Sequence, residues 1–288
     1  MTYNPNTQNN KIVSRYSLVN LGSSASLRMW LVSICAFLVI LQSAFGDSFR
    51  SLGLAFAVTS AALLTEFLFL YKKQKTGMLK DGSAVASALI FTMLLPNMIS
   101  PIYAILGIIF AVAVIKHCFG GLGSNWLNPA AGGWLFIRLA WPAAFSRALQ
   151  VPPGFTAGAS IAETHVRPFL NSTVFALLKI ELPPSGLDLL SFNYPGIIAD
   201  RGIFALLIGS ILILALKACR TWIPAIWLAV FIFLIRLVPG GTQYGGIFTA
   251  LCSGGTLAAV FMLAADPATN AKSVTGCCIF AALGGFLA

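Results

Sequence analysis

Residues 52–80 read LGLAFAVTSAALLTEFLFLYKKQKTGMLK, and this stretch decides the class of fold. The run from Leu52 to Tyr71 holds a single charged side chain, Glu66, and four lysines follow at positions 72, 73, 75 and 80. An apolar run of this length predicts a membrane-spanning helix. A lysine-rich loop predicts that the far end of the helix faces the cytoplasm. The polar tail of residues 1–27 is then cytoplasmic as well.

The composition of the whole chain points the same way. Of its 288 residues, 58% are hydrophobic and only 9% are charged, and the mean hydropathy is +0.88. A soluble domain carries about a quarter charged residues, so this chain cannot cover a water-facing surface. We exclude a soluble enzyme, a disordered protein and a coiled coil. The sequence predicts an all-α polytopic membrane protein, with one integral membrane domain over residues 28–288 and a long outer loop at 146–200.

Nine apolar segments are predicted to be transmembrane helices, within a range of eight to ten. They are residues 29–45, 52–71, 83–98, 102–115, 127–145, 203–216, 223–237, 246–264 and 273–288. The net charge of +10 fits the positive-inside rule, with Lys116 among the cytoplasmic charges and Asp200 among the outer acids. The positive excess therefore indicates loop orientation, and we expect no nucleic-acid partner.

Several of these segments are short and are interrupted by glycine and proline. Residues 82–96 resemble residues 253–267, because each stretch is a helix rich in small residues that stops at a proline. Broken helices in corresponding places predict two related repeats with a binding site between them. The alternative interpretation is that the small residues only allow helices to pack closely.

The cysteines and histidines do not suggest a metal site. None of the six cysteines forms a C-x-x-C pair, and His117 lies far along the chain from His165. We expect no metal centre built by this chain alone. A cluster shared with another protein of an assembly stays open.

Residues 118–130, CFGGLGSNWLNPA, are the most distinctive stretch. The glycines permit close approach of a ligand to the backbone, and the asparagines offer hydrogen-bond donors and acceptors to a polar ligand. These candidate binding residues are Gly120, Gly121, Gly123, Asn125 and Asn128. Asn128 before Pro129 is also the pattern of a helix N-cap.

Three charged residues in or beside apolar runs have two interpretations each. Glu66 is expected to snorkel or to pair with Lys72, with a role in transport as the alternative. Arg138 is expected in the middle of a helix, facing the bundle interior or a polar ligand such as a flavin phosphate. Asp266, before Pro267, is typical of a helix cap, and alternatively of a carboxylate on a cation path.

The stretch at 118–130 resembles the F-G-G-L-G-x-N-x-F-N-P-A signature of the RnfD/NqrB family. These proteins are membrane subunits of the Rnf and the sodium-pumping NADH:quinone oxidoreductase complexes. Other stretches resemble the family in the same order, and they are residues 81–85 with 94–96, 186–190, 194–196, and 253–255 with 261–267. The resemblance covers roughly residues 29–288.

The resemblance implies an FMN joined through its phosphate to a threonine of the outer loop. Thr173 takes that position, six residues before Lys179. The residues upstream depart from the family pattern, and they are Arg167, Leu170, Asn171 and Ser172. Thr164 is a poorer candidate, and the alternative for Thr173 is a helix N-cap without flavin.

The expected function is therefore that of an FMN-carrying subunit of a six-subunit complex in the bacterial inner membrane. It would relay electrons and couple them to cation transport, after maturation by a flavin transferase and in contact with membrane lipid. The chemistry of NADH or ferredoxin would belong to partner subunits, so the chain would not be catalytic alone. The resemblance leaves room for a second flavin. The alternatives are a small-solute transporter or channel of similar broken-helix fold without redox chemistry, and a scaffold protein that has lost its cofactor.

Overall fold

The computed structural model describes residues 25–46, 49–74, 76–119, 125, 127–149, 197–216, 220–237, 251–252, 255–263 and 273–287. Within these ranges every regular element is a helix, and extended pairing is limited to one isolated antiparallel bridge, between Pro96 and Ile197. The predicted all-α class is therefore confirmed.

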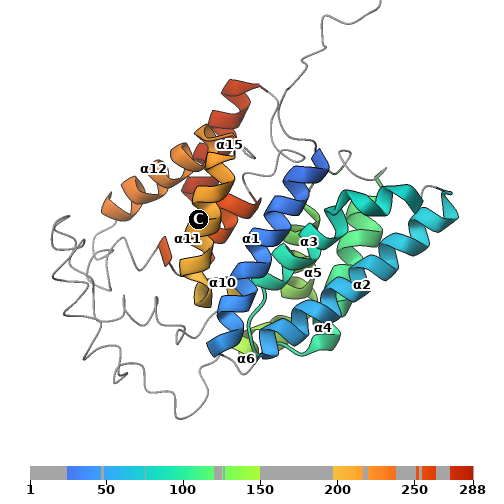
Figure 1. Cartoon of the computed structure of the whole chain (residues 1–288). Coiled ribbons are helices and arrows are strands. Elements are labelled where there is room, and N and C mark those ends of the chain that lie inside the picture. The colour runs from blue at the N-terminus through green and yellow to red at the C-terminus, as the bar shows by residue number, and fades with distance from the viewer. Residues whose placement is uncertain are drawn as a thin grey trace, which may run out of the picture.

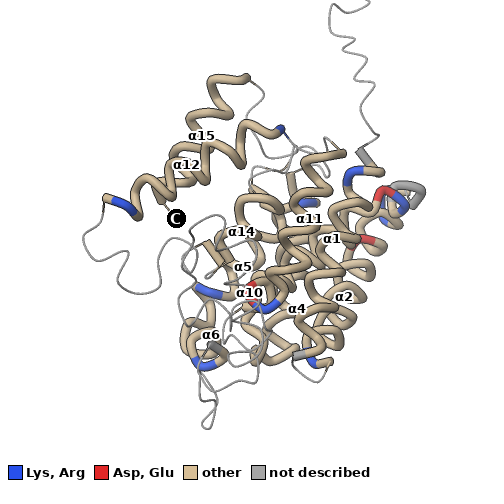
Figure 2. The backbone as a smooth tube through the Cα atoms, turned by 60° about the vertical axis from the view of Figure 1, so that its left-hand side comes forward, with Lys and Arg blue, Asp and Glu red and all other residues tan. Residues whose placement is uncertain are grey.

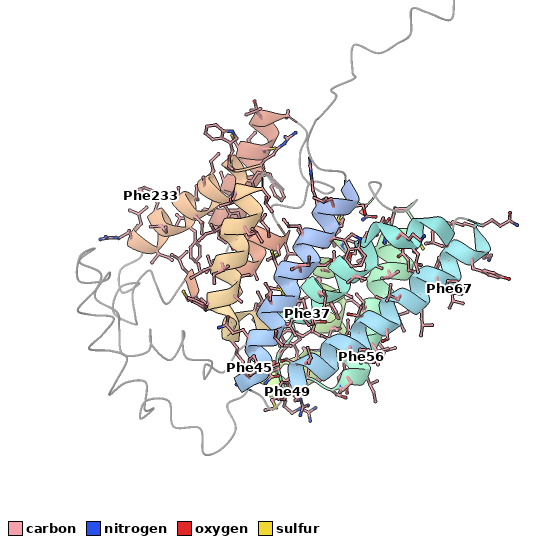
Figure 3. All side chains as sticks on the ribbon, viewed as in Figure 1. Phe37, Phe45, Phe49, Phe56, Phe67 and Phe233 are labelled. Atoms are coloured by element: carbon pink, nitrogen blue, oxygen red, sulfur yellow. The ribbon has the colours of Figure 1, made fainter. Side chains whose placement is uncertain are left out.

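Two helices are long and apolar enough to cross a membrane by length and composition. They are α1 (Ala25–Gly46) and α2 (Arg50–Lys72), close to the two runs expected from the sequence. Large apolar side chains point outward from them, as Figure 3 shows for Phe45 and Phe56, which are 69% and 77% exposed. Charged residues are sparse along the described part of the tube (Figure 2). An outer surface of this kind suits lipid.

The remaining helices are shorter, and they pack on α1, on α2 or on one another. They are α3 (Ser83–Met93), α4 (Pro101–Phe110), α5 (Pro129–Ala140), α6 (Pro142–Leu149), α10 (Ile198–Arg201), α11 (Ile203–Ala215), α12 (Trp222–Leu237) and α15 (Val274–Leu287). In Figure 1, α2 to α5 lie on one side of α1 and α11, α12 and α15 on the other. Helix α1 joins the two groups, because it packs against both α3 and α11.

The segment expected as one span over residues 127–145 is two helices. The chain breaks at Trp141, where φ is −133° and ψ is 61°, and α6 begins at Pro142. A proline inside an apolar run removes a backbone donor and clashes with the preceding turn, so the helix ends before it. Helix α5 has 12 residues and a length of about 18 Å, shorter than the apolar core of a bilayer at ~30 Å. The prediction of a single span there is wrong.

Two other expected segments also end differently. The segment expected at 102–115 is α4 continued by a π-helix, η3 (Ala111–His117). The segment expected at 83–98 ends as a helix at Met93, and Pro96 then pairs with Ile197. π-Helices are rare and frequently occur at functional sites. The residues of η3 are therefore candidates for a functional site.

The two stretches of similar sequence start in a similar way. Gly82 (φ 76°) precedes α3, and Gly255 (φ 74°) precedes α14 (Thr256–Ala258), which continues as the π-helix η4 (Ala259–Leu263). At each start a carboxylate accepts a hydrogen bond from a backbone N–H. Oδ1 of Asp81 lies 2.9 Å from the backbone nitrogen of Ser83, and Oδ1 of Asp200 lies 2.8 Å from that of Gly255. Two related repeats stay a prediction, now with a matching backbone feature at their starts.

Candidate functional site

Helix α5 begins as the sequence indicates. Asn128 is the N-cap, with φ −62° and ψ 126°, and its Oδ1 accepts a hydrogen bond of 2.9 Å from the backbone N–H of Ala130. Pro129 occupies the first turn, where no intrahelical donor is needed. The predicted cap is confirmed. It fixes the chain at the C-terminal end of the distinctive stretch 118–130.

Asn125 is the second described asparagine of this stretch. Its Oδ1 is buried and accepts no hydrogen bond from any residue in the described part of the chain. An unpaired buried acceptor costs free energy, so this oxygen is suited to a ligand that brings a donor. Gly120, Gly121 and Gly123 lie outside the described residues, and so does Thr173.

Arg138 does not lie where the sequence led us to expect it. It occupies the last turn of α5 and its side chain is exposed, with the guanidinium carbon 4.9 Å from the ring centroid of Phe145. A rise of 1.5 Å per residue places its backbone about 15 Å from that of Asn128. The structure therefore does not bring Arg138 together with the two asparagines. Asp266 lies outside the described residues.

A buried ion pair lies at the other end of the stretch. Nζ of Lys116 is 2.8 Å from both carboxylate oxygens of Glu66, and the two side chains are 2% and 3% exposed. We expected Lys116 among the cytoplasmic charges, and Glu66 to snorkel or to pair with Lys72. The expectation for Glu66 is wrong, because η3 carries Lys116 inward against α2.

His117 and Ser83 complete the surroundings of this pair. Nε2 of His117 is 3.1 Å from Oε2 of Glu66, and its ring stacks on Phe69 with centroids 4.9 Å apart and planes at 2°. The third hydrogen bond of Lys116 goes to Oγ of Ser83 at 2.7 Å. Ser83 in turn donates to Oδ1 of Asp81 at 2.7 Å.

The spacing of the charged residues in the sequence could have indicated this network. Glu66 and Lys72 are six residues apart, and side chains meet on a helix only at three or four. A charge inside an apolar run normally pairs with another such charge, and Lys116 closes the apolar run at 102–115. Asp200 is a second charged residue whose burial we did not expect. It was counted among the outer acids, and it is 4% exposed.

Taken together, the fold and these contacts define an all-helical membrane protein with charged groups buried inside its bundle, beside a glycine- and asparagine-rich stretch. More narrowly, the chain belongs to the NQR2, RnfD, RnfE family, whose model matches residues 12–288. The resemblance drawn from the stretch 118–130 is thereby confirmed.

Curated relatives are similar over most of the chain, and each is named as a subunit of an ion-translocating complex. The relative from the proton-translocating ferredoxin:NAD(+) oxidoreductase complex of Clostridium ljungdahlii is 25% identical over 285 residues, which cover 93% of this chain and 82% of the relative. The relative from the Na(+)-translocating ferredoxin:NAD(+) oxidoreductase complex of Acetobacterium woodii is 30% identical over 233 residues, 78% of this chain and 66% of the relative. The relative from the ion-translocating oxidoreductase complex of Shewanella piezotolerans is 28% identical over 263 residues, 78% of this chain and 73% of the relative.

Proposed function

We propose that this protein is the FMN-carrying membrane subunit of an ion-translocating electron-transport complex of the Rnf/Nqr type. The observation that carries the proposal is the family match over residues 12–288. Relatives named as members of ferredoxin:NAD(+) oxidoreductase complexes support it. In this role the chain relays electrons and couples their passage to cation movement, and it is not catalytic alone.

The described residues fit a flavin at one point. Oδ1 of Asn125 is a buried acceptor without a donor among the described residues, and the ring edge of a flavin carries an N–H that could meet it. Helix α5 begins four residues later, so this oxygen lies close along the chain to a fixed helix start. When bound, the flavin supplies one-electron transfer chemistry. The protein supplies its position and its surroundings.

The residues of this chain have separate tasks in that proposal. Asn128 holds the start of α5 and thereby one end of the glycine-rich stretch. Gly120, Gly121 and Gly123 allow the ligand close to the backbone. Thr173 carries the FMN through its phosphate, and the family resemblance leaves room for a second flavin.

We place the protein in the bacterial inner membrane, with its N-terminal tail in the cytoplasm. The lysines that follow α2 support this orientation. Five further subunits of a six-subunit complex would bring the NADH or ferredoxin chemistry, and a flavin transferase would attach the FMN.

The test of covalent attachment is a denaturing gel. The protein is produced together with a flavin transferase, and a phosphoester bond survives denaturation, so a fluorescent band is expected at its mass. Thr173→Ala should remove the fluorescence but not the protein, since loss of an exposed cap costs only ~1 kcal/mol. Thr164→Ala is the matched control and should keep the fluorescence.

Two other outcomes bear on the proposal. A wild-type band that never fluoresces beside a competent transferase would end the covalent claim and would show that the altered residues upstream of Thr173 prevent modification. A colourless protein that conducts a small solute in liposomes would support the alternative, a transporter or channel without redox chemistry. Thr173→Ser keeps the hydroxyl, so loss of fluorescence in that variant would reflect the selectivity of the transferase.

A further inference from the structure

A continuous hydrogen-bonded network links the edge of the bundle to its interior. It runs from Asp81 at the end of η2 (Thr76–Asp81), which is half-buried, to His117, which is 6% exposed. Its members in order are Asp81, Ser83, Lys116, Glu66 and His117. Neither the flavin nor its attachment requires these side chains.

The charges of the network do not balance when His117 is neutral. Asp81 and Glu66 bring two negative charges and Lys116 brings one positive charge, so one negative charge is left over. Asp81 is half-buried, so this excess charge is held partly away from water, and holding it there is costly. One additional proton on the network removes that charge.

The geometry favours a proton over a metal cation as the group that balances the charge. Both oxygens of Glu66 already contact the ammonium of Lys116, which lies where a metal ion bound by that carboxylate would lie. All three N–H groups of Lys116 are engaged, two with Glu66 and one with Ser83. The remaining contact of the carboxylate is with the ring nitrogen of His117, and an imidazole nitrogen readily exchanges a proton.

We propose that this network binds one exchangeable proton, shared between Nε2 of His117 and Oε2 of Glu66, and passes it through Lys116 and Ser83 to Asp81. The binding of the proton is independent of the proposed function. Its use in moving ions across the membrane rests on that function.

The hydrogen bonds from Lys116 to Ser83 and from Ser83 to Asp81 point in the direction that this transfer needs. Lys116 donates to Glu66, so a proton can enter Lys116 only after Lys116 has lost one. A proton leaves Nζ of Lys116 for Oγ of Ser83 while the hydroxyl proton of Ser83 leaves for Oδ1 of Asp81. Lys116 is then a neutral amine and Asp81 a neutral acid. The proton held between His117 and Glu66 moves to Lys116 and restores the ammonium, and Asp81 releases its proton to water. The network has then lost one proton, which His117 takes up again.

The elements packed around His117 bring few other charges. His117 lies in η3, which packs against α2, α4 and α5. Helix α2 contributes Glu66 and carries Arg50 and Lys72 at its two ends. Helix α4 has no charged residue, and Arg138 of α5 is exposed. Lys116 of η3 and Asp81 of η2 join the network through their hydrogen bonds. The nearby exposed lysines of the described residues are Lys72, Lys73 and Lys80. They lie at the end of the bundle that the sequence predicts as cytoplasmic, next to Asp81, where a released proton would meet water.

The first experiment measures whether His117 takes up the proton. The chain has two histidines, so His165→Asn leaves His117 as the single signal in protein labelled with ¹⁵N-histidine and placed in lipid nanodiscs. NMR spectra are recorded from about pH 5 to about pH 9. We expect uptake of one proton by the ring, and in Glu66→Gln a loss of proton affinity of roughly tenfold or more, because the imidazolium loses its carboxylate. A ring whose protonation never changes, or an unchanged affinity in Glu66→Gln, would overturn the proposal.

The second experiment tests the path and leaves both members of the ion pair in place. Ser83→Ala removes the one hydroxyl between Lys116 and Asp81, and Ser83→Thr keeps a hydroxyl as the matched control. Exchange of the His117 ring proton with water should slow by roughly tenfold or more in Ser83→Ala and remain close to wild type in Ser83→Thr. Equal exchange rates in all three proteins would refute the path, even if Glu66→Gln fails to fold. Both readouts need neither flavin nor partner subunits, so a failure of the proposed function would leave them unchanged.

Discussion

The packing of α4 against α5 depends on glycine at position 133. A Cβ atom added there would lie 2.9 Å from the carbonyl oxygen of Gly107, 3.0 Å from Cβ of Ala111 and 3.2 Å from a ring carbon of Phe91. The carbonyl oxygen belongs to the backbone and cannot turn aside, so α4 and α5 must separate. We therefore predict that Gly133→Ala destabilises the protein.

The magnitude follows from a comparison with Gly53→Ala. Gly53 lies in α2, and a Cβ added there has nothing within 4 Å. Alanine favours a helix over glycine by about 0.5–1 kcal/mol at both positions, so this gain cancels between the two variants. The difference that is left is the cost of overpacking, about 1–3 kcal/mol. Gly53→Ala should be slightly more stable than wild type, and Gly133→Ala less stable.

Thiol accessibility provides the assay. Cys35, Cys252 and Cys277 are buried, so a thiol-reactive dye reports unfolding of the protein in detergent as temperature or denaturant rises. The two variants are compared with wild type under one condition. A Gly133→Ala protein that unfolds at or above the midpoint of Gly53→Ala would refute the close contact between α4 and α5.

Three other predictions follow from the charges and the loops. Lys116→Met should destabilise the protein by about 3–5 kcal/mol, because it leaves the carboxylate of Glu66 buried without its ammonium partner. Adding Glu66→Gln should recover more than half of the lost stability. The same dye assay measures both variants. In inside-out and right-side-out vesicles, a membrane-impermeant thiol reagent should label Lys75→Cys from the cytoplasmic side and Ser185→Cys from the outer side, and the reverse pattern would reject the topology. Gly121→Val should lower flavin occupancy, since a β-branched residue resists positive φ and close approach, and full occupancy at normal yield would argue against the ligand-loop interpretation.

The features that the sequence predicted well are those set by neighbouring residues. Long apolar runs became α1 and α2, and Asn128 became the N-cap of α5 because its partner is Ala130, two residues away. The break at Trp141 could also have been predicted, since a proline follows it. Local chemistry decides each of these features without reference to the rest of the fold.

The features that the sequence did not predict depend on how distant segments pack. Glu66 and Lys116 are 50 positions apart, and their pairing exists only because η3 packs on α2. The exposed position of Arg138 likewise depends on α5 ending at Ala140 and on Phe145 lying beside it. The buried oxygen of Asn125, which has no partner among the described residues, could not have been predicted at all, since burial of one atom is set by the whole bundle.

The two flanks of the glycine-rich stretch are held by contacts that meet in η3. Lys116 anchors one flank through Glu66, and Gly132 of α5 packs on Ile115, the residue before Lys116. A Cβ at position 132 would clash with the end of the Ile115 side chain, which must then change rotamer and press on η3. We therefore expect Gly132→Ala and Lys116→Met to be coupled, with a double-mutant interaction energy of at least about 0.5 kcal/mol in the dye assay. Gly53→Ala combined with Lys116→Met is the control and should be additive, because Gly53 touches none of these residues. If the effects of Gly132→Ala and Lys116→Met are as additive as those of the control pair, then η3 does not connect the ion pair to α5. The charged network and the glycine-rich stretch would then act independently.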